Sequence, residues 1–262
     1  EGVREELYCE PARVGASYLG RTLIEACMYT APVLRIERDE GWISIPQWER
    51  SEELHEWCET FLDPLLAALP KTQPHSIGWD FGRYADRSVL APCTLEQNLV
   101  RRVPFLIEMQ GLPHNDQWTI LAYVGDRLPC FFRACLDAGG NGSWIAEQAL
   151  IAWGPDIVDQ VDITLRWYAE QMPAFREAHE RGIIAYPRDL DVRNDLALIR
   201  RIDGVPKLPK VRTDSATSGV KRHGDAAIAL VMAYSASREA EAEAARWDAL
   251  SAPVITVDPW ST

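Results

Sequence analysis

The sequence has no run of 18 or more apolar residues, the length that a helix needs to cross a membrane. Its first residues, EGVREELYCEP, contain neither a basic segment followed by an apolar stretch nor an initiator methionine. We therefore expect no transmembrane helix and no signal peptide, and we expect the chain to be a processed or excised piece of a longer protein.

Residue patterns that mark several common kinds of site are also missing. The six cysteines contain no CxxC pair and the five histidines form no HExxH, which argues against a zinc site or a disulfide framework and predicts reduced thiols. The sequence has neither GxxxxGKS/T nor GxGxxG, so an ATPase or dinucleotide site is not expected. A GxSxG elbow is absent too, which removes the usual signature of a serine hydrolase.

Positive charge is scarce in this sequence. The 262-residue chain has 27 Lys and Arg against 39 Asp and Glu, a formal net charge of −12. An excess of negative charge opposes general binding of nucleic acids, whose phosphates are contacted by Lys and Arg. Basic residues are nevertheless concentrated in segment 200–222, which holds seven of them and two acidic residues. This basic segment either steers a polyanion to one face of the acidic body or is an ordinary solvated loop.

The apolar spacing divides the chain into three parts. Residues 1–74 are predicted to be a mostly helical N-terminal extension, with a short hairpin at Val33–Ile45. Residues 75–236 alternate strand and helix patterns, which predicts an α/β domain with a mixed sheet flanked by helices. Residues 237–262 are predicted to be a charged helix followed by a proline-containing tail.

Local signals set the expected helix boundaries. Helical spacing covers Tyr18–Tyr29, and Ser51 begins a second helix with the character of a capping box. A helix over Ile163–Arg181 is expected to be interrupted or restarted at Pro173, because proline removes a backbone donor. A further helix is predicted over Asp189–Ile202, with basic residues in its last turn.

Three aspartates hold special positions in the α/β part. Asp80 ends one strand pattern, Asp137 ends a later one, and Asp225 lies at the start of the last core helix. Strand ends and helix starts converge on one edge of such a sheet. Carboxylates brought together there need a cation to stay ionised, and Mg²⁺ or Mn²⁺ prefers oxygen ligands. Two such ions can promote phosphodiester cleavage. Taken singly, the three acids could equally be a turn residue, an Asx turn and a helix cap.

The glycine-rich segment Asp137–Gly142 follows a strand and begins a helix, a context that suits phosphate binding. Its glycines do not have the order of a nucleotide-binding loop. The alternative is a tight turn that packs the strand against the helix and holds Asp137 at the edge of the sheet.

Three segments together resemble a known family. They are Ile77–Arg83 with Asp86, then Asp137–Gly142, then Arg222–Ala227 (RHGDAA). In their order, spacing and position at strand ends they resemble the C-terminal nuclease domain of tailed-phage terminase large subunits, nearest to the type in Mu-like prophages. The resemblance covers about residues 75–236.

This resemblance implies an RNase H-like fold, a mixed central sheet flanked by helices. It also implies a nuclease that uses a carboxylate cluster and two Mg²⁺ or Mn²⁺ ions to cut concatemeric double-stranded DNA during packaging. Carried over to this sequence, Asp80 would be the metal-bridging acid, Asp137 the second ligand and Asp225 the third. Asp86 would match an additional acid, and His223 would orient a ligand or touch phosphate.

The same resemblance implies partners. The basic segment falls where these domains carry a hairpin near the active site, so contact with double-stranded DNA is expected from Lys207, Lys210, Arg212, Lys221 and Arg222. Glu6–Pro11 more weakly resembles the segment after a terminase ATPase domain, which implies an N-terminal ATPase domain in the full-length protein. The portal and the small terminase subunit are implied as further partners, in the host cytoplasm and away from membranes.

Two other functions fit the same residues. Another RNase H-like nuclease, such as a resolvase or a transposase-like enzyme, would cut branched DNA in preference to linear duplex. A non-catalytic docking module of the packaging motor would instead use the tryptophan-rich N-terminal part (Trp42, Trp48 and Trp57) and the charged C-terminal helix, and it would have no affinity for metal.

Overall fold

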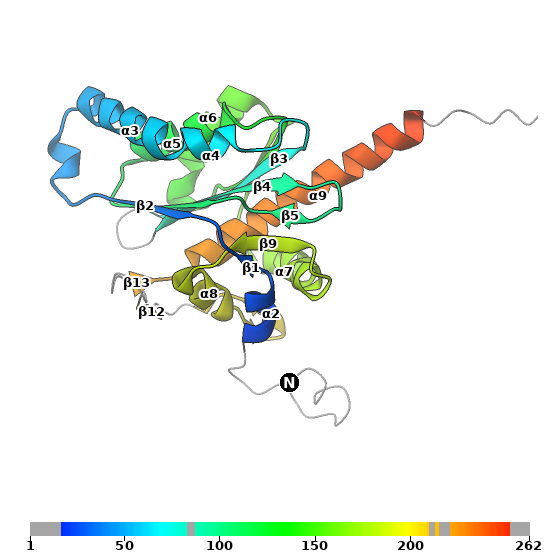
Figure 1. Cartoon of the computed structure of the whole chain (residues 1–262). Helices are drawn as coiled ribbons and strands as arrows, with labels where there is room; N and C mark the ends of the chain where they lie inside the picture. Colours follow the sequence, from blue (N-terminus) through cyan, green and yellow to red (C-terminus); the bar gives the residue numbers. More distant parts are fainter. Residues whose placement is uncertain (1–16, 83–86, 210–212, 215–220, 252–262) are drawn as a thin grey trace, which may run out of the picture.

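Nine strands of the described chain form one mixed sheet with helices on both faces (Figure 1). The computed structural model describes residues 17–82, 87–209, 213–214 and 221–251. The strands of the main sheet are β1 (Met28–Tyr29), β2 (Val33–Glu37), β3 (His75–Asp80), β4 (Ser88–Leu95), β5 (Arg101–Arg102), β6 (Leu106–Gln110), β7 (Phe131–Asp137), β8 (Val158–Val161) and β9 (Ile184–Pro187).

The sheet has the order β1-β9-β5-β4-β3-β7-β8, and β6 joins β4 to β2 on a second branch. Strands β3, β7 and β8 run parallel, whereas β4 is antiparallel to β3. Two small hairpins lie outside this sheet: β10 (Arg200–Ile202) with β11 (Val205–Lys207), and β12 (Thr213–Asp214) with β13 (Lys221–Arg222). The mixed sheet flanked by helices confirms the predicted fold class.

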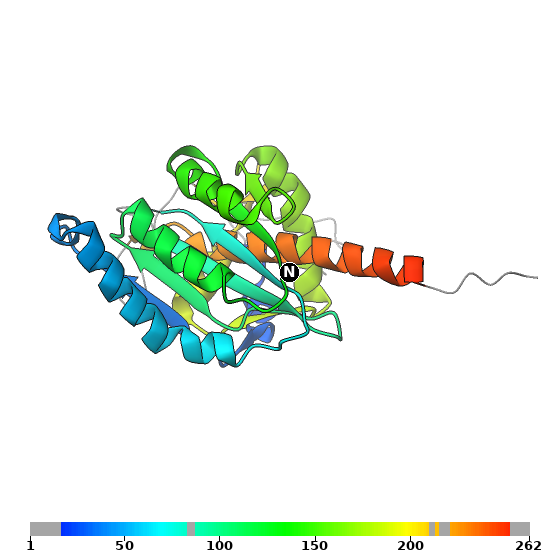
Figure 2. The same cartoon turned by 90° about the horizontal axis from the view of Figure 1, so that it is seen from above.

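Two groups of helices cover the two faces (Figures 1 and 2). One group is α3 (Gln47–Phe61), α4 (Asp63–Ala67), α5 (His114–Gly125) and α6 (Ser143–Trp153), and the other is α2 (Arg21–Ala26), α7 (Leu165–Glu180), α8 (Leu190–Ala197) and α9 (Asp225–Ser251). Short 3₁₀ turns, η1 (Trp42–Ser44) and η2 (Gly140–Gly142), precede α3 and α6. None of the helices in the described part of the chain has the length and apolar character needed to cross a membrane.

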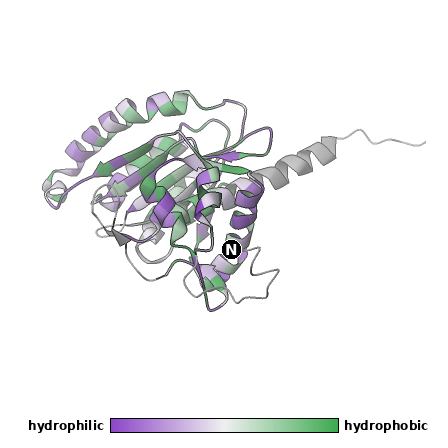
Figure 3. Ribbon diagram, turned by 60° about the horizontal axis from the view of Figure 1, so that its bottom comes forward, coloured by the Kyte–Doolittle hydropathy of each residue, from purple (hydrophilic) through white to green (hydrophobic). Residues whose placement is uncertain are grey.

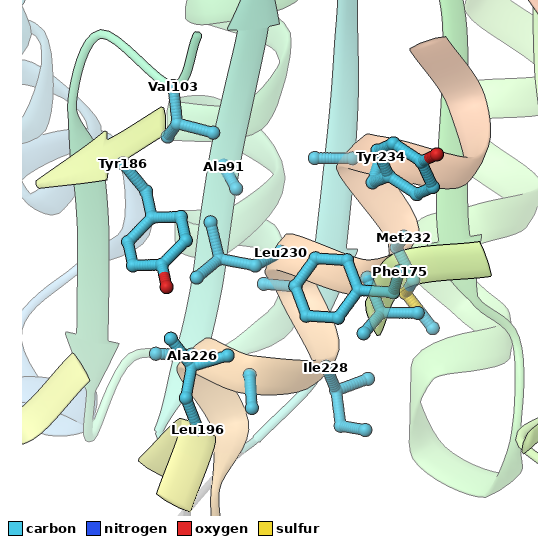
Figure 4. Packing of buried hydrophobic residues seen from close by; sticks show 14 of the residues in the cluster. Ala91, Val103, Phe175, Tyr186, Leu196, Ala226, Ile228, Leu230, Met232 and Tyr234 are labelled. Atoms are coloured by element: carbon cyan, nitrogen blue, oxygen red, sulfur yellow. The ribbon is translucent and has the colours of Figure 1, made fainter. Parts of the chain in front are cut away.

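The centre of the sheet is buried on both faces. Every residue of β3 and β4 is buried, as expected of strands that helices cover on both faces of the sheet. Figure 3 shows hydrophobic residues following the strands. On the α9 side, Ile228, Leu230 and Met232 of the helix pack with residues of the sheet and of α7 (Figure 4).

Cysteine side chains belong mainly to this interior. Cys58 and Cys93 are buried and free, and burial raises the pKa of each thiol to about 12. Cys130 is exposed and also free. Thiols with such raised pKa values stay protonated at neutral pH, as expected of core cysteines.

The predicted N-terminal extension is an integral part of the sheet over its described residues. Strand β1 pairs with β9, and β2 pairs in parallel with β6, with Val33 opposite Leu106. The prediction of a hairpin over Val33–Ile45 is therefore wrong: the partner of β2 lies far along the chain, and the turn after it leads into η1. No packing boundary separates residues 17–74 from the rest of the described core, since Leu54 and Leu62 join the same cluster as Ile77.

Several helix boundaries differ from the sequence prediction. Helix α3 begins at Gln47, before Ser51, and α7 continues through Pro173, because Met172 and Phe175 beside it are fully buried and packing offsets the lost hydrogen bond. Helix α8 ends at Ala197, and the following residues form β10. Helix α9 crosses the predicted boundary after residue 236 without a break.

One buried carboxylate fastens the N-terminal segment to the core. Asp116 of α5 is 1% exposed and accepts hydrogen bonds from Trp42 Nε1 (2.6 Å) and from Arg50 Nε (2.9 Å). Trp42 is therefore a core residue, whereas Trp48 is 69% exposed and Trp57 is half-buried. Of the three tryptophans assigned to a docking module, Trp48 alone presents a largely exposed side chain.

We expect Asp116→Ala to lower the free energy of unfolding by about 3–5 kcal/mol, because it leaves the Arg50 guanidinium buried without its carboxylate. Chemical denaturation measures this change. The matched control is Glu170→Ala, which removes an exposed ion pair with Arg166 and is expected to cost less than about 0.5 kcal/mol. Equal effects of the two variants would contradict an integral role of the N-terminal segment.

Candidate active site

The first two predicted acids lie at adjacent positions on one edge of the sheet. Asp80 is the last residue of β3, and Asp137 is the last residue of β7. These strands are parallel neighbours with Trp79 opposite Leu136, so they end side by side at the same edge of the sheet. Asp80 is 7% exposed and Asp137 is half-buried.

The third predicted acid reaches this edge from the helix that covers the sheet. Asp225 is the first residue of α9 and is 5% exposed. Its Oδ2 accepts a hydrogen bond from the backbone N–H of Arg87 (3.3 Å). Because β4 is antiparallel to β3, with Val89 opposite Asp80, Arg87 lies beside the end of β3. The structure thus brings all three acids to the same edge.

The glycine-rich loop after β7 is a tight turn that fixes Asp137. Its Oδ1 accepts a hydrogen bond from Gly139 N–H (2.9 Å). A Cβ on Gly142 would lie 2.5 Å from the Asp137 carbonyl oxygen and 3.2 Å from Phe81 Cβ, so only glycine fits between these two strand ends. The loop geometry matches the alternative of close packing between strand and helix.

Asp137 has an unusual electrostatic environment. The pKa of its carboxyl is raised to about 6, mainly by burial and in smaller part by the nearby Asp162 carboxylate, while the hydrogen bond from Gly139 opposes the shift. A carboxylate that is costly to ionise at neutral pH is characteristic of a site that gains from a cation or a proton.

Two further residues belong to this edge and were not predicted from the sequence. Asp162 directly follows β8, the parallel neighbour of β7, and its Oδ1 would lie 3.9 Å from a Cβ on Gly139. Burial raises the pKa of the Tyr168 phenol, and the Asp80 and Asp137 carboxylates lie close enough to raise it as well. Asp162 carries the same sequence signal as Asp80 and Asp137, an acid at a strand end. Tyr168 has no sequence signal, since the packing of α7 places it there.

The chemistry of this edge fits a hard divalent cation. Its donors are carboxylate oxygens, the ligands that Mg²⁺ prefers, and two of the acids, Asp80 and Asp225, are buried at this edge. Among the residues that the structure describes, no group of three or more His, Cys, Asp and Glu side chains is arranged to hold one ion. The fit therefore depends on donor type and on shared position at the edge. Asp86, the additional predicted acid, lies outside the described residues.

The predicted DNA-contacting residues are in different situations. Lys207 of β11 is partly exposed, with its Nζ 3.8 Å from Asp203 Oδ2, and His223 is half-buried. Lys221 belongs to β13, while Lys210 and Arg212 lie outside the described residues.

The prediction of DNA contact is wrong for Arg222. This side chain is 1% exposed and forms ion pairs with Glu108 and Asp195, so it cannot reach a phosphate without leaving the core. Counting charges along the sequence treats it as part of a basic surface, whereas the fold neutralises it internally.

Comparison with known proteins identifies relatives of this chain. It is 38% identical over 240 residues to the probable terminase large subunit gp28 of Escherichia phage Mu, a match that covers 90% of the chain and 44% of the relative. Over nearly its whole length the chain is homologous to part of the Mu-type terminase large subunits. A second relative, the Mu-like prophage FluMu protein gp28 of Haemophilus influenzae, is 37% identical over 234 residues, with 89% and 46% covered. The chain thus spans less than half the length of these relatives of the terminase family.

The comparison of structures agrees with this family at the level of fold. The large terminase of bacteriophage HK97 is similar with a TM-score of 0.52 at 10% identity, over 83% of this chain and 43% of the HK97 chain. The predicted RNase H-like fold is confirmed. No family model matches the sequence.

Proposed function

We propose that this chain is the nuclease part of a phage packaging terminase, a divalent-metal-dependent endonuclease that cuts concatemeric double-stranded DNA. The observation that carries the proposal is the position of Asp80, Asp137 and Asp225 at one edge of an RNase H-like sheet in a relative of Mu-type terminases. No Ser, Cys or Lys nucleophile is required for this chemistry, because water is the attacking group.

Asp80 and Asp137 would hold the metal, and Asp225 would complete its shell. When bound, a pair of Mg²⁺ or Mn²⁺ ions supplies Lewis-acid chemistry for phosphodiester hydrolysis. The chain's own residues orient the acids: Gly139 N–H holds the Asp137 carboxylate, and Arg87 N–H holds that of Asp225. Tyr168 keeps its phenolic proton at neutral pH, since its pKa is raised, and it can donate a hydrogen bond at the edge.

The proposed substrate contact uses the basic segment without Arg222. Lys207, Lys210, Arg212, Lys221 and His223 are proposed to meet the DNA backbone. With a net charge of −12, the chain is expected to bind DNA weakly and with strong dependence on salt. We propose that an N-terminal ATPase domain in the full-length protein, and the portal and small terminase subunit as partners, contribute the remaining affinity.

The test is cleavage of supercoiled plasmid by the wild-type chain with Mn²⁺, with Mg²⁺ and with EDTA, beside Asp80→Asn. We expect nicked and linear product with metal and none with EDTA, and no product from Asp80→Asn, because the substitution removes a carboxylate ligand. Asp156→Asn is the matched control, since Asp156 is an exposed acid away from the edge.

Circular dichroism establishes that each protein is folded before the comparison. A folded wild type that shows neither cutting nor metal binding in Mn²⁺ would contradict the nuclease proposal and favour a docking module. Cutting of branched DNA far in excess of linear duplex would contradict the packaging role and favour a resolvase-like enzyme.

A further inference from the structure

A buried ionic network lies directly behind the third acid. The Arg222 guanidinium donates to both oxygens of Glu108 in β6 (Nη1–Oε2 2.9 Å, Nη2–Oε1 2.8 Å). It also donates to both oxygens of Asp195 in α8 (Nε–Oδ1 3.1 Å, Nη2–Oδ2 2.6 Å). The three side chains are at most 1% exposed. Arg222 therefore joins the sheet to α8 through two two-pronged contacts, a geometry that lysine cannot reproduce.

Each of the two carboxylates of this network contacts a residue next to Asp225, either along the chain or through a hydrogen bond. Asp195 Oδ2 accepts a hydrogen bond from the backbone N–H of Ala226 (3.2 Å), which directly follows Asp225. Glu108 Oε2 lies 3.8 Å from Arg87 Nη1, and the backbone N–H of Arg87 donates to Asp225 itself. The first turn of α9, and Arg87 whose backbone N–H donates to Asp225, thus both contact carboxylates that Arg222 binds.

Without Arg222, this arrangement would not be stable in its present form. Glu108 and Asp195 would face each other in the core, and like charges in a dry site repel. Arg35 contacts Glu108 (Nε–Oε2 3.0 Å), so one carboxylate would retain a cation while Asp195 would lose its ion pair. The start of α9 is the element that such a change would affect most, because Asp195 accepts a hydrogen bond from the backbone N–H of Ala226.

We propose that Arg222 is a positioning residue for Asp225: through Asp195 and Glu108 it fixes the start of α9 so that the third carboxylate is held at the metal-binding edge. This inference rests on the proposed function for the role of Asp225 as a metal ligand. The part that concerns structure, that Arg222 fixes the start of α9, does not depend on that function. It replaces DNA contact, the role that the basic segment suggested for Arg222. The role proposed for the network is to fix geometry. Buried ion pairs contribute little net stability, so stabilisation of the fold is not its main effect.

The experiment compares Arg222→Lys with wild type and with Arg21→Lys, whose arginine is exposed and pairs with Glu25 on the next turn of its own helix. The first measurement is hydrogen–deuterium exchange of the metal-free proteins. We expect Arg222→Lys to speed exchange of the amides at Asp225–Ala229 by at least about tenfold, because local opening becomes easier. Amides of β3 and all amides of Arg21→Lys are expected to keep their wild-type rates.

The second measurement is Mn²⁺ binding by calorimetry, together with DNA binding in EDTA. We expect Arg222→Lys to weaken Mn²⁺ binding by about 10–100-fold, as for loss of a group that orients a ligand, and to leave DNA affinity within about twofold of wild type. Unchanged exchange and Mn²⁺ affinity together with weakened DNA binding would overturn the proposal and restore the DNA-contact role.

A second variant covers the case in which Arg222→Lys does not fold. Asp195→Asn then replaces it, because asparagine keeps the shape and can still accept from Ala226 while losing the ion pair; unchanged Mn²⁺ affinity and exchange in that variant would overturn the proposal. If the wild type neither binds Mn²⁺ nor cuts DNA, the proposed function fails, and the exchange rates at the start of α9 still decide whether Arg222 positions Asp225.

Discussion

Asp137→Asn is expected to abolish cleavage and to stabilise the metal-free protein at the same time. Loss of cleavage by a factor on the order of 10³ or more follows from removing a charged ligand at the reacting edge. The gain in stability follows from the environment of the carboxylate, which is half-buried and lies near Asp162. An ionised group in that position opposes folding, and a neutral amide of the same shape does not.

The sign of this effect sets its pH dependence. The pKa of Asp137 is about 6 in the folded protein and near 3.8, the ordinary value, in the unfolded chain. The unfolded chain therefore loses its proton first, and the stability of the wild type falls as pH rises from about 4 to 6. With allowance for partial exposure to solvent, Asp137→Asn is expected to be more stable by about 1–2 kcal/mol at pH 8. The advantage should disappear below pH 4.

Urea unfolding at pH 8 and pH 4, without metal, measures this difference. Asp156→Asn, at an exposed position, is expected to change stability by less than about 0.5 kcal/mol at both values. Adding Mn²⁺ should stabilise the wild type and have little effect on Asp137→Asn, since ligand binding stabilises only the form that binds it. An Asn variant that is inactive but less stable than wild type at pH 8 would show that Asp137 is mainly a structural residue.

Position along strands predicted that two of the acids share one edge of the sheet. Asp80 and Asp137 follow apolar runs, and the carboxyl ends of parallel strands share an edge. The same rule applies to Asp162, which follows β8 and which the prediction did not use. The role of Tyr168 could not be predicted, because the direction of α7 depends on packing across the whole sheet.

Local patterns failed where distant segments decide the structure. The strand at Val33–Glu37 is followed by a turn signal, and a hairpin is the nearest solution, yet its edge is satisfied by β6. The prediction that Arg222 contacts DNA was wrong for the same reason. Its neighbours along the sequence are basic, whereas the carboxylates that neutralise it come from β6 and α8. Strand pairing and ion pairs between remote segments are set by the tertiary fold. A sequence pattern covers only a short stretch of neighbouring residues, so it cannot predict them.

Gly78→Ala is expected to be the most damaging single-methyl change in the core. A Cβ on Gly78 would lie 2.1 Å from Ala233 N and 2.2 Å from Ala229 O, both atoms of the α9 backbone. A flexible side chain could move aside, but a helix backbone cannot move locally, so α9 must shift as a body away from β3. Overpacking in cores typically costs 1–3 kcal/mol, and here we expect at least about 3 kcal/mol because backbone must yield.

The small residues of α9 are explained by the same contact. Ala226, Ala229 and Ala233 are fully buried, and their small side chains let the helix approach the sheet closely. Because α9 begins at Asp225, its distance from β3 also sets how the third acid meets Asp80. Gly78→Ala is therefore expected to lower both the free energy of unfolding and the affinity for Mn²⁺ in whatever fraction remains folded.

Gly20→Ala is the matched control for this substitution. Gly20 has a φ of −63°, and no described atom lies within 4 Å of the position that a Cβ would take there. Because Gly20 is the N-cap of α2, where glycine is preferred to alanine, the entropic gain is offset and the change in stability should stay within about 1 kcal/mol. Urea denaturation of the two variants and of wild type gives the comparison. Similar midpoints for Gly78→Ala and Gly20→Ala would mean that α9 does not rest on β3. A large loss confined to Gly78→Ala would establish that the close approach of helix and sheet both holds the core together and places Asp225 at the edge.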